Sequence, residues 1–253
     1  MSNSLNQPRL NTPASISIVI PAYNEAKRLP QTLAALATYQ TEQQINMELI
    51  IVVEPSEDKT LEIALNWAAN QPLVKVIANP VQQGKGFAVK TGMLKAEGDI
   101  IFFMDADLSV PLHFIGVFTD FFAANKELMI GIGSRQHPGS FIELHQSYLR
   151  RNMGRIFNVA VQALSGLNIK DTQCGFKAFR RAVVAPLFQA QFTHGFAFDV
   201  EILHRAQSSG FRIMEMPINW KNSPQSHVKI ITDSLRMLRD VYHISRRNRE
   251  TAR

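Results

Sequence analysis

Asp105 and Asp107 are the residues of this sequence best suited to hold a metal ion. They directly follow the apolar run Ile100–Met104, and two carboxylates so close together are costly to ionise unless positive charge neutralises them. Mg²⁺ or Mn²⁺ supplies that charge, and Mg²⁺ usually takes one or two carboxylates together with substrate phosphates. Alternatively, one aspartate caps a helix that starts near Pro111 and the other faces solvent. Their place after a buried strand favours the metal site.

Lys85, which lies between two glycines, is a candidate for binding an anion. Glycines let the backbone approach a phosphate, the lysine adds charge, and the N-terminus of the helix expected to follow adds its dipole. A solvated turn is the alternative. The segment does not match a P-loop, and no Gly-x-Gly-x-x-Gly motif follows the first expected strand, so a P-loop NTPase and an NAD-binding protein are both disfavoured.

Short apolar runs alternate with helical segments in the first half of the chain. Strands are expected at Ile16–Pro21, Glu48–Val53, Val74–Ala78 and Ile100–Met104, and helices at about 24–39, from 58 onward and at about 87–96. This pattern predicts an α/β fold with a doubly wound, mostly parallel sheet and helices on both faces. Ligands bind at the carboxyl ends of such strands, so the polar segments there should form one site. These segments are Pro21–Glu25, Glu54, Asn79 and Asp105–Asp107.

The second half of the chain is less regular. Strands are expected at Met129–Gly133, Gln173–Phe179 and Phe211–Trp220, and helices at Gln146–Leu164, Ala197–Gln207 and Ile230–Ser245. No linker separates the halves. We therefore expect a flexible tail at 1–14, a single domain at 15–245 and a basic tail at 246–253, with the domain made of a first half (15–133) and a second half (134–245).

Composition sets the class of protein. The chain has 253 residues, of which 45% are hydrophobic and 19% charged, as in ordinary globular domains. No apolar run reaches the roughly 18 residues needed to span a bilayer, and the polar start does not resemble a signal peptide. The lone Cys174 suits a reducing compartment, and with no neighbouring histidine we expect it to pack rather than to react. A cytoplasmic protein, soluble or peripheral to a membrane, is expected.

Positive charge is concentrated in two segments. The net charge is +6, while residues 134–181 hold eight basic and two acidic side chains and residues 221–253 hold eight and three. An anionic partner is therefore expected, which leaves nucleic acid, a membrane surface and a phosphorylated ligand open. Both segments contain a basic amphipathic helix, as is typical of proteins at anionic bilayers. Alternatively, the apolar faces of these helices pack on the sheet.

Several motifs, in this order, resemble those of GT-A glycosyltransferases of family 2. The motifs are PAYNEAKRL, QGKGFAVKTGML, FFMDADLSVP, GSRQH, DTQCGFKAFRR, FAFDVEILHRA and PINWKNSPQSHVK. The resemblance covers residues 16 to about 240 and is strongest to enzymes that use polyprenyl phosphates, namely dolichyl-phosphate glucosyltransferase and dolichyl-phosphate mannose synthase. It implies inverting transfer of glucose or mannose from UDP-glucose or GDP-mannose to a polyprenyl or dolichyl phosphate with Mg²⁺ or Mn²⁺.

The resemblance also implies that residues 15–133 form the nucleotide-binding half of the domain and residues 134–245 its acceptor half. It further implies roles for individual residues. Asp105 and Asp107 would hold the metal and the diphosphate, and Asp171 and Asp199 would lie at the reaction centre. The other assigned residues are Pro21, Tyr23, Glu25, Glu54 and Lys85 for the nucleotide, Arg135 and Arg151 for the acceptor phosphate, and Gln173 and Glu201 for the sugar. Glu54 stands where many members have aspartate, so the base stays open between uracil and guanine.

The acceptor decides whether a catalytic base is needed. A phosphate is already anionic near neutral pH and can attack the sugar directly, whereas a hydroxyl must lose a proton to a carboxylate. A family member acting on a soluble hydroxyl acceptor is therefore the nearest alternative. A nucleotidyltransferase lacks support because PAYNEA is not glycine-rich, and a basic nucleic-acid-binding protein is a further alternative, although no nucleic-acid partner is expected.

Overall fold

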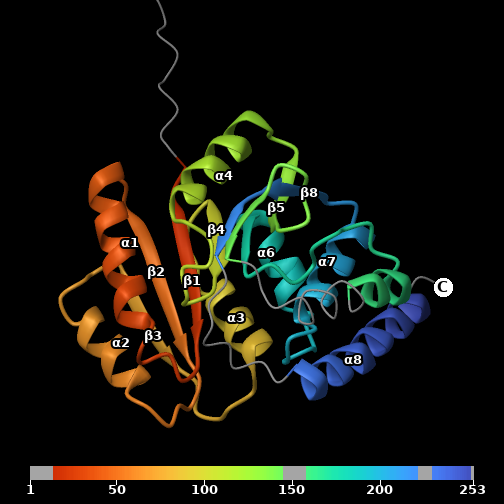
Figure 1. Ribbon diagram of the computed structural model, residues 1–253, viewed down its shortest axis with the longest axis horizontal. Helices are drawn as coiled ribbons and strands as arrows, with labels where there is room; N and C mark the ends of the chain where they lie inside the picture. Colours follow the sequence, from red (N-terminus) through yellow and green to blue (C-terminus); the bar gives the residue numbers. More distant parts are fainter. Residues whose placement is uncertain (1–13, 145–157, 222–229, 252–253) are drawn as a thin grey trace, which may run out of the picture.

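The computed structural model describes residues 14–144, 158–221 and 230–251 (Figure 1). Seven strands form one sheet in the order β3-β2-β1-β4-β7-β5-β8, and β6 pairs with β9 in a second, two-stranded sheet. All pairs in the large sheet are parallel except those that β7 makes with β4 and β5. The strands are β1 Ile16–Ala22, β2 Met47–Val53, β3 Val74–Ala78, β4 Ile100–Met104, β5 Leu128–Ser134, β6 Phe141–Leu144, β7 Phe176–Arg180, β8 Arg212–Pro217 and β9 Asn219–Lys221.

Helices cover both faces of the large sheet, as predicted (Figure 1). They are α1 Leu29–Gln43, α2 Thr60–Ala68, α3 Lys85–Met93, α4 His113–Ala124, α6 Arg181–Phe188, α7 Phe198–Ser208 and α8 Ile230–Thr251, and residues 158–165 are also helical. None of the described helices combines the length and apolar character needed to cross a membrane.

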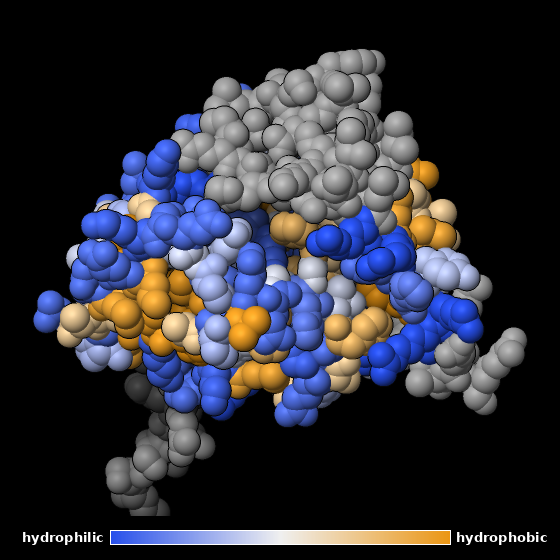
Figure 2. Space-filling model, turned by 90° about the horizontal axis from the view of Figure 1, so that it is seen from below, coloured by the Kyte–Doolittle hydropathy of each residue, from blue (hydrophilic) through white to orange (hydrophobic). Residues whose placement is uncertain are grey.

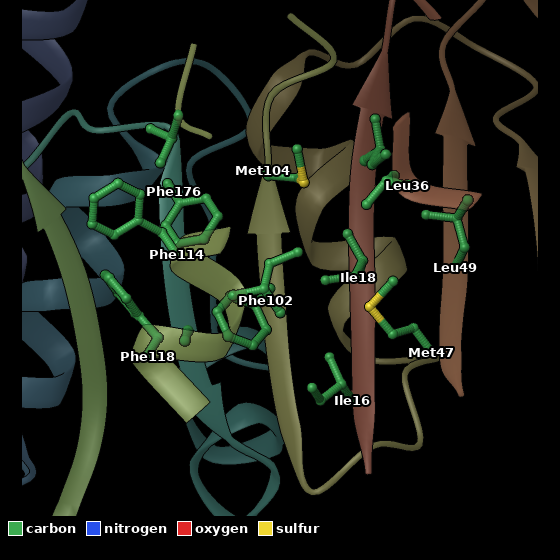
Figure 3. Close-up of a cluster of buried hydrophobic side chains, with 14 of the residues drawn as sticks. Ile16, Ile18, Leu36, Met47, Leu49, Phe102, Met104, Phe114, Phe118 and Phe176 are labelled. Carbon is green, nitrogen blue, oxygen red and sulfur yellow. The ribbon is translucent and has the colours of Figure 1, made fainter. Parts of the chain in front are cut away.

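Two apolar cores result from the alternation of side chains along the strands. Ile18 of β1 packs with Leu36 of α1 and Phe118 of α4 on one face, where Figure 3 shows these side chains together. Its neighbour Val19 points to the opposite face and packs in a core with residues of α3, α6, α7 and α8, such as Val241. Because both faces are buried, the central strands read as continuous apolar runs, and this explains why the sequence predicted them well.

The first half of the fold agrees closely with the sequence prediction, except at the start of α1. A helix was expected from Asn24, but α1 begins at Leu29. Asn24 has a φ of 54°, in the left-handed region, which is incompatible with a right-handed helix. Residues 24–28 form turns instead, and they lie directly after β1 at the edge where a site is expected.

The second half differs more from the prediction. The strand expected from Gln173 begins at Phe176, and the strand expected at Phe211–Trp220 is divided between β8 and β9. Pro217 ends β8 because it cannot donate a backbone hydrogen bond. Helix α6 was missed, since Pro186 lies inside it and argues against a helix in the sequence.

The C-terminal tail was also predicted wrongly in part. Helix α8 continues to Thr251, so most of the expected basic tail is helical. The absence of Gly or Pro after Ser245 explains why the helix continues. The predicted N-terminal tail lies almost wholly outside the described residues. The same holds for the first part of the helix expected at Gln146–Leu164.

Candidate active site

A cleft of about 740 Å³ lies at the carboxyl ends of β1, β2 and β4. Figure 2 looks onto this edge of the molecule and shows hydrophilic residues around a hollow. The residues predicted for the nucleotide and the metal all line the cleft: Pro21, Tyr23, Glu25, Glu54, Lys85, Asp105 and Asp107. The polar segments that contain these residues therefore meet in one cleft at this edge of the sheet.

Asp105, at the end of β4, is held by an ion pair of its side chain and by a hydrogen bond of its backbone. Lys85 Nζ lies 2.6 Å from Asp105 Oδ1, and the Asp105 N–H donates to the carbonyl of Gly175 at 3.1 Å. A side chain at position 175 would overlap the Asp105 carboxylate, so the close approach requires glycine. Burial would lower the pKa of Lys85, but the carboxylates of Asp105 and Asp199 outweigh it and raise that pKa above its ordinary value. Lys85 is therefore a fixed positive charge.

Asp107 is oriented by a turn and faces a second cation. Its Oδ1 accepts the Ser109 N–H at 2.9 Å, and its Oδ2 lies 3.9 Å from Arg28 Nη1. Arg28 Nε also donates to Glu25 Oε2 at 2.6 Å. The N-cap of α4 is Leu112 and makes no capping side-chain bond, so neither aspartate caps that helix. The helix-cap alternative for the aspartate pair is wrong.

The donor set of the cleft suits a divalent cation that shares its coordination with a substrate. Five carboxylates line the cleft against three cations, so its wall is net negative without a bound ion. Among the residues that the structure describes, no group of three or more His, Cys, Asp or Glu side chains could hold a metal. An ion bound by Asp105 and Asp107 would therefore take its other ligands from substrate oxygens or water, as Mg²⁺ commonly does.

Glu54 shapes the wall that carries Lys85. It is buried and accepts hydrogen bonds from Asn79 Nδ2 at 2.6 Å, from the Gln83 N–H at 2.6 Å and from the Gly84 N–H at 3.1 Å. Gly84 has a φ of 107°, which favours glycine. The Gly86 N–H donates to the His194 carbonyl at 2.7 Å. These three backbone amides already have partners within the protein, so the positive charge that this segment offers to the cleft comes chiefly from the Lys85 side chain.

A second group of predicted residues lies outside the cleft lining. Asp171 is buried and accepts hydrogen bonds from Arg135 Nε at 2.8 Å and Nη2 at 2.7 Å. Burial would raise the pKa of Asp171, but the Arg135 guanidinium outweighs burial and lowers it. Arg135 also lies 5.5 Å from the centre of the Trp220 ring. The two residues therefore form an ion pair that lies outside the cleft lining.

Asp199 and Glu201 are both bound by protein groups. Lys177 Nζ lies 2.5 Å from Asp199 Oδ1, and burial raises the pKa of Asp199 even though this lysine favours the ionised form. Glu201 accepts the backbone N–H groups of Phe192 and Thr193 and pairs with Arg205 Nε at 2.9 Å. Glu201 is fully buried, so the expectation that it faces a sugar is wrong. It fixes the chain just before Gly195, which lines the cleft.

The remaining predicted residues can be placed only in part. Gln173 is half-buried, and its Nε2 is buried with no hydrogen-bond partner in the part of the chain that the structure describes. Arg151 lies outside the described residues. Cys174 is buried, and burial raises its pKa to about 12, which agrees with a packing role rather than a nucleophilic one.

The sequence analysis missed several residues of the cleft. Arg28 follows Glu25 by three residues in the segment expected to begin a helix, and this spacing could have indicated that the two residues pair. Arg236 and Asp240, one turn apart on α8, line the cleft together with Met237, whereas the amphipathic pattern of α8 was related only to membranes or the core. Lys177 lies within the DTQCGFK motif, but nothing in the sequence pairs it with Asp199.

An α/β sheet with a carboxylate-lined cleft at its carboxyl edge fits a class of enzymes that bind nucleotides. Comparison with known proteins identifies the family. Residues 17–188 match the model of Glycosyl transferase family 2, so the chain belongs to this family and is a glycosyltransferase.

Relatives with assigned activities match most of the chain. The dolichyl-phosphate beta-glucosyltransferase of Trichomonas vaginalis is 32% identical over 94% of this chain and 73% of its own. The enzymes of the same name from Dictyostelium discoideum (32% identity, 90% and 73% covered) and Saccharomyces cerevisiae (30%, 94% and 76%) are similar too. The predicted resemblance to the dolichyl-phosphate glucosyltransferase group is confirmed.

Solved structures confirm the predicted GT-A fold. Glucosyl-3-phosphoglycerate synthase of Mycobacterium tuberculosis superposes with a TM-score of 0.68 at 16% identity, covering 92% of this chain and 81% of that one. A complex of the same enzyme with Mn²⁺, UDP and its product gives 0.67 at 18% identity, with 92% and 80% covered. At this identity the likeness concerns the fold alone.

Proposed function

We propose that this enzyme transfers glucose, with inversion, from UDP-glucose to a polyprenyl or dolichyl phosphate. The observation that carries the proposal is the joint placement of Asp105, Asp107 and Lys85 in one cleft at the sheet edge. The relatives named above are dolichyl-phosphate glucosyltransferases, and their activity supports glucose rather than mannose as the sugar that this enzyme transfers. GDP-mannose remains the alternative donor, to be decided by assay.

The charges of the cleft match the chemistry of the donor. Transfer breaks the bond between the anomeric carbon and the diphosphate, and the leaving nucleoside diphosphate gains negative charge as the bond breaks. The positively charged Lys85 side chain stabilises that negative charge directly. Mg²⁺ or Mn²⁺, held by Asp105 and Asp107, would supply the further positive charge that stabilises the diphosphate. Arg28 keeps Asp107 oriented, because it bridges this carboxylate and Glu25.

The state of Asp171 and Asp199 favours a phosphate acceptor. Each is bound to a cation, Asp171 to Arg135 and Asp199 to Lys177, and neither lines the cleft. A hydroxyl acceptor would need a carboxylate to take its proton, whereas an acceptor phosphate oxygen attacks the anomeric carbon without proton transfer. Arg135 keeps 30% of its side chain exposed and is our candidate for orienting the acceptor phosphate, together with Arg151.

We also propose that the enzyme works at the cytoplasmic face of a membrane. The C-terminal half of α8 exposes Tyr242, Arg246 and Arg247 in neighbouring turns. An aromatic residue among arginines suits the interface of an anionic bilayer, where each basic residue contributes about 1 kcal/mol. Flotation with phosphatidylserine vesicles should recover the protein, and equal recovery with neutral phosphatidylcholine vesicles would contradict an electrostatic contact.

The test of the activity is a transfer assay with labelled UDP-glucose and GDP-mannose, each offered dolichyl phosphate or a soluble alkyl glycoside. The proposal predicts a labelled lipid product from UDP-glucose that depends on Mg²⁺ or Mn²⁺. A product formed only on the soluble hydroxyl acceptor would establish the alternative family activity. Labelled lipid formed only from GDP-mannose would overturn the proposed donor.

A further inference from the structure

Helix α8 supplies one wall of the cleft, although it is remote in sequence from the other walls. Arg236, Met237 and Asp240 line the same cleft as Lys85 and Asp105. In Figure 1, α8 begins near the carboxyl edge of the sheet and runs away beside α7. The cleft is therefore completed by a helix that comes from the last part of the chain.

The same helix packs on the core through its buried residues. Met237, Val241 and Ile244 are buried, and the latter two belong to the core that contains α3 and α7. The Arg247 guanidinium lies 4.5 Å from the centre of the Phe192 ring. Phe192 belongs to the segment whose backbone is bound by Glu201. These contacts determine how α8 is rotated about its axis and therefore which of its residues face the cleft.

Arg236 differs from the other cations of the cleft. Lys85 is paired with Asp105, and Arg28 is bonded to Glu25. Arg236 is exposed and has no hydrogen bond or ion pair within residues 14–144, 158–221 and 230–251. All of its donors are therefore available to a ligand within the described cleft wall. A guanidinium binds phosphate oxygens in a bidentate way, which fits an anionic group in this cleft.

We propose that Arg236 binds the diphosphate of the nucleotide donor. Donor binding would then stabilise α8 in its position at the cleft. This inference rests on the proposed function, because it assumes a nucleoside diphosphate in the cleft. The assignment to the donor rather than to the acceptor phosphate follows from its neighbours, since Arg236 shares the cleft with Tyr23, Gln83 and Lys85. Arg236 acts here as a binding residue that couples the last helix to the nucleotide site.

Calorimetric titration of the full chain with UDP and UMP in Mg²⁺ tests this assignment, with GDP and GMP used in parallel. For Arg236→Gln we expect about tenfold weaker diphosphate binding, equivalent to about 1.4 kcal/mol, and less than a twofold change for the monophosphate. Arg236→Lys should fall between the wild type and Arg236→Gln. Arg239→Gln is the matched control, because Arg239 is an exposed arginine of the same helix outside the cleft lining, and it should bind like the wild type.

Hydrogen exchange of the same samples tests the coupling. The diphosphate should slow exchange of the α8 amides in the wild type and in Arg239→Gln, but much less in Arg236→Gln. Unchanged diphosphate affinity in Arg236→Gln, or equal losses for diphosphate and monophosphate, would overturn the inference while the proposed function stands. A wild-type protein that binds neither UDP nor GDP would overturn the proposed function, and this inference with it.

Discussion

Ion pairs occur both in the cleft and outside its lining, but they differ in how far they are exposed. We call the pairs outside the lining, Lys177–Asp199 and Arg135–Asp171, the buried layer. In the cleft, the side chains of Lys85 and Asp105 are 22% and 37% exposed. In the buried layer, those of Lys177 and Asp199 are 1% and 6% exposed. An exposed pair can exchange its partner for a phosphate or a metal at little cost, whereas a buried charge cannot lose its partner without a large desolvation penalty. We therefore expect the partly exposed pairs to serve binding and the buried pairs to hold the shape of the cleft.

The largest effect on activity is expected at the aspartates that line the cleft. Asp107→Ala should reduce glucosyl transfer at least about hundredfold, because the diphosphate loses its stabilising charge. The melting temperature should stay close to that of the wild type, since Asp107 makes no buried ion pair. Asp120→Ala, an exposed aspartate on α4 outside the cleft lining, is the control and should keep full activity. Normal transfer by Asp107→Ala would contradict a binding role for the carboxylates of the cleft.

The largest effect on stability is expected in the buried layer. Lys177 donates to Asp199 and to the Cys174 carbonyl, so Lys177→Met leaves a buried carboxylate without its partner. We expect a loss of about 3–5 kcal/mol in the free energy of unfolding, measured by urea denaturation. The double variant Lys177→Met with Asp199→Leu should recover much of this loss, since it removes both charges. A single variant as stable as the wild type would show that the pair is not structural.

Gly175→Ala tests the close contact between Gly175 and the Asp105 carboxylate. The added methyl group would overlap the Asp105 carboxylate, so Asp105 must move away from its position beside Lys85. A displacement of about 1 Å can cost up to about a hundredfold in rate, and we expect transfer to fall at least about tenfold. Gly116→Ala on α4 is a matched control, because its new methyl group would meet only the hydroxyl of Tyr39, at 3.3 Å. Equal activity of the two variants would contradict a fixed position for Asp105.

The smallest effect is expected in the pH dependence of stability. Because the pKa of Asp171 is lowered by Arg135, this pair stabilises the fold above the ordinary aspartate pKa of about 3.9. The stabilisation is lost as the pH falls through the lowered pKa. Asp171→Asn should therefore be about 1–3 kcal/mol less stable than the wild type at pH 7, and the difference should shrink toward pH 3. A difference that does not vary with pH would contradict an ionised Asp171.

The exposed site could be predicted from the sequence because its residues follow buried strands. Tyr23, Glu54 and Asp105 each come just after a continuous apolar run, and parallel strands place their carboxyl ends at one edge. The positions of the central strands followed from the same runs. The pattern of apolar runs thus predicted which segments of the first half of the chain line the cleft, without any knowledge of side-chain contacts.

The buried layer could not be predicted, because its partners are distant in sequence and are brought together by topology. Strand β7 enters antiparallel between β4 and β5, which places Lys177 beside Asp199 and Gly175 beside Asp105. Nothing in the local pattern distinguishes an aspartate in a buried pair from one at a reaction centre. The role of α8 was hidden for a similar reason, since its basic residues suit a membrane surface as well as a cleft.

The central claim is that Asp105 and Asp107 hold a divalent cation on which binding of the donor diphosphate depends. Titration of the wild type with UDP, in Mn²⁺ and then in excess chelator, tests this most directly, with Asp105→Asn and Asp107→Asn measured alongside. We predict that Mn²⁺ strengthens binding at least about tenfold in the wild type, about 1.4 kcal/mol, and has little effect in either variant. Equal affinity for UDP with and without the metal in the wild type would contradict the account.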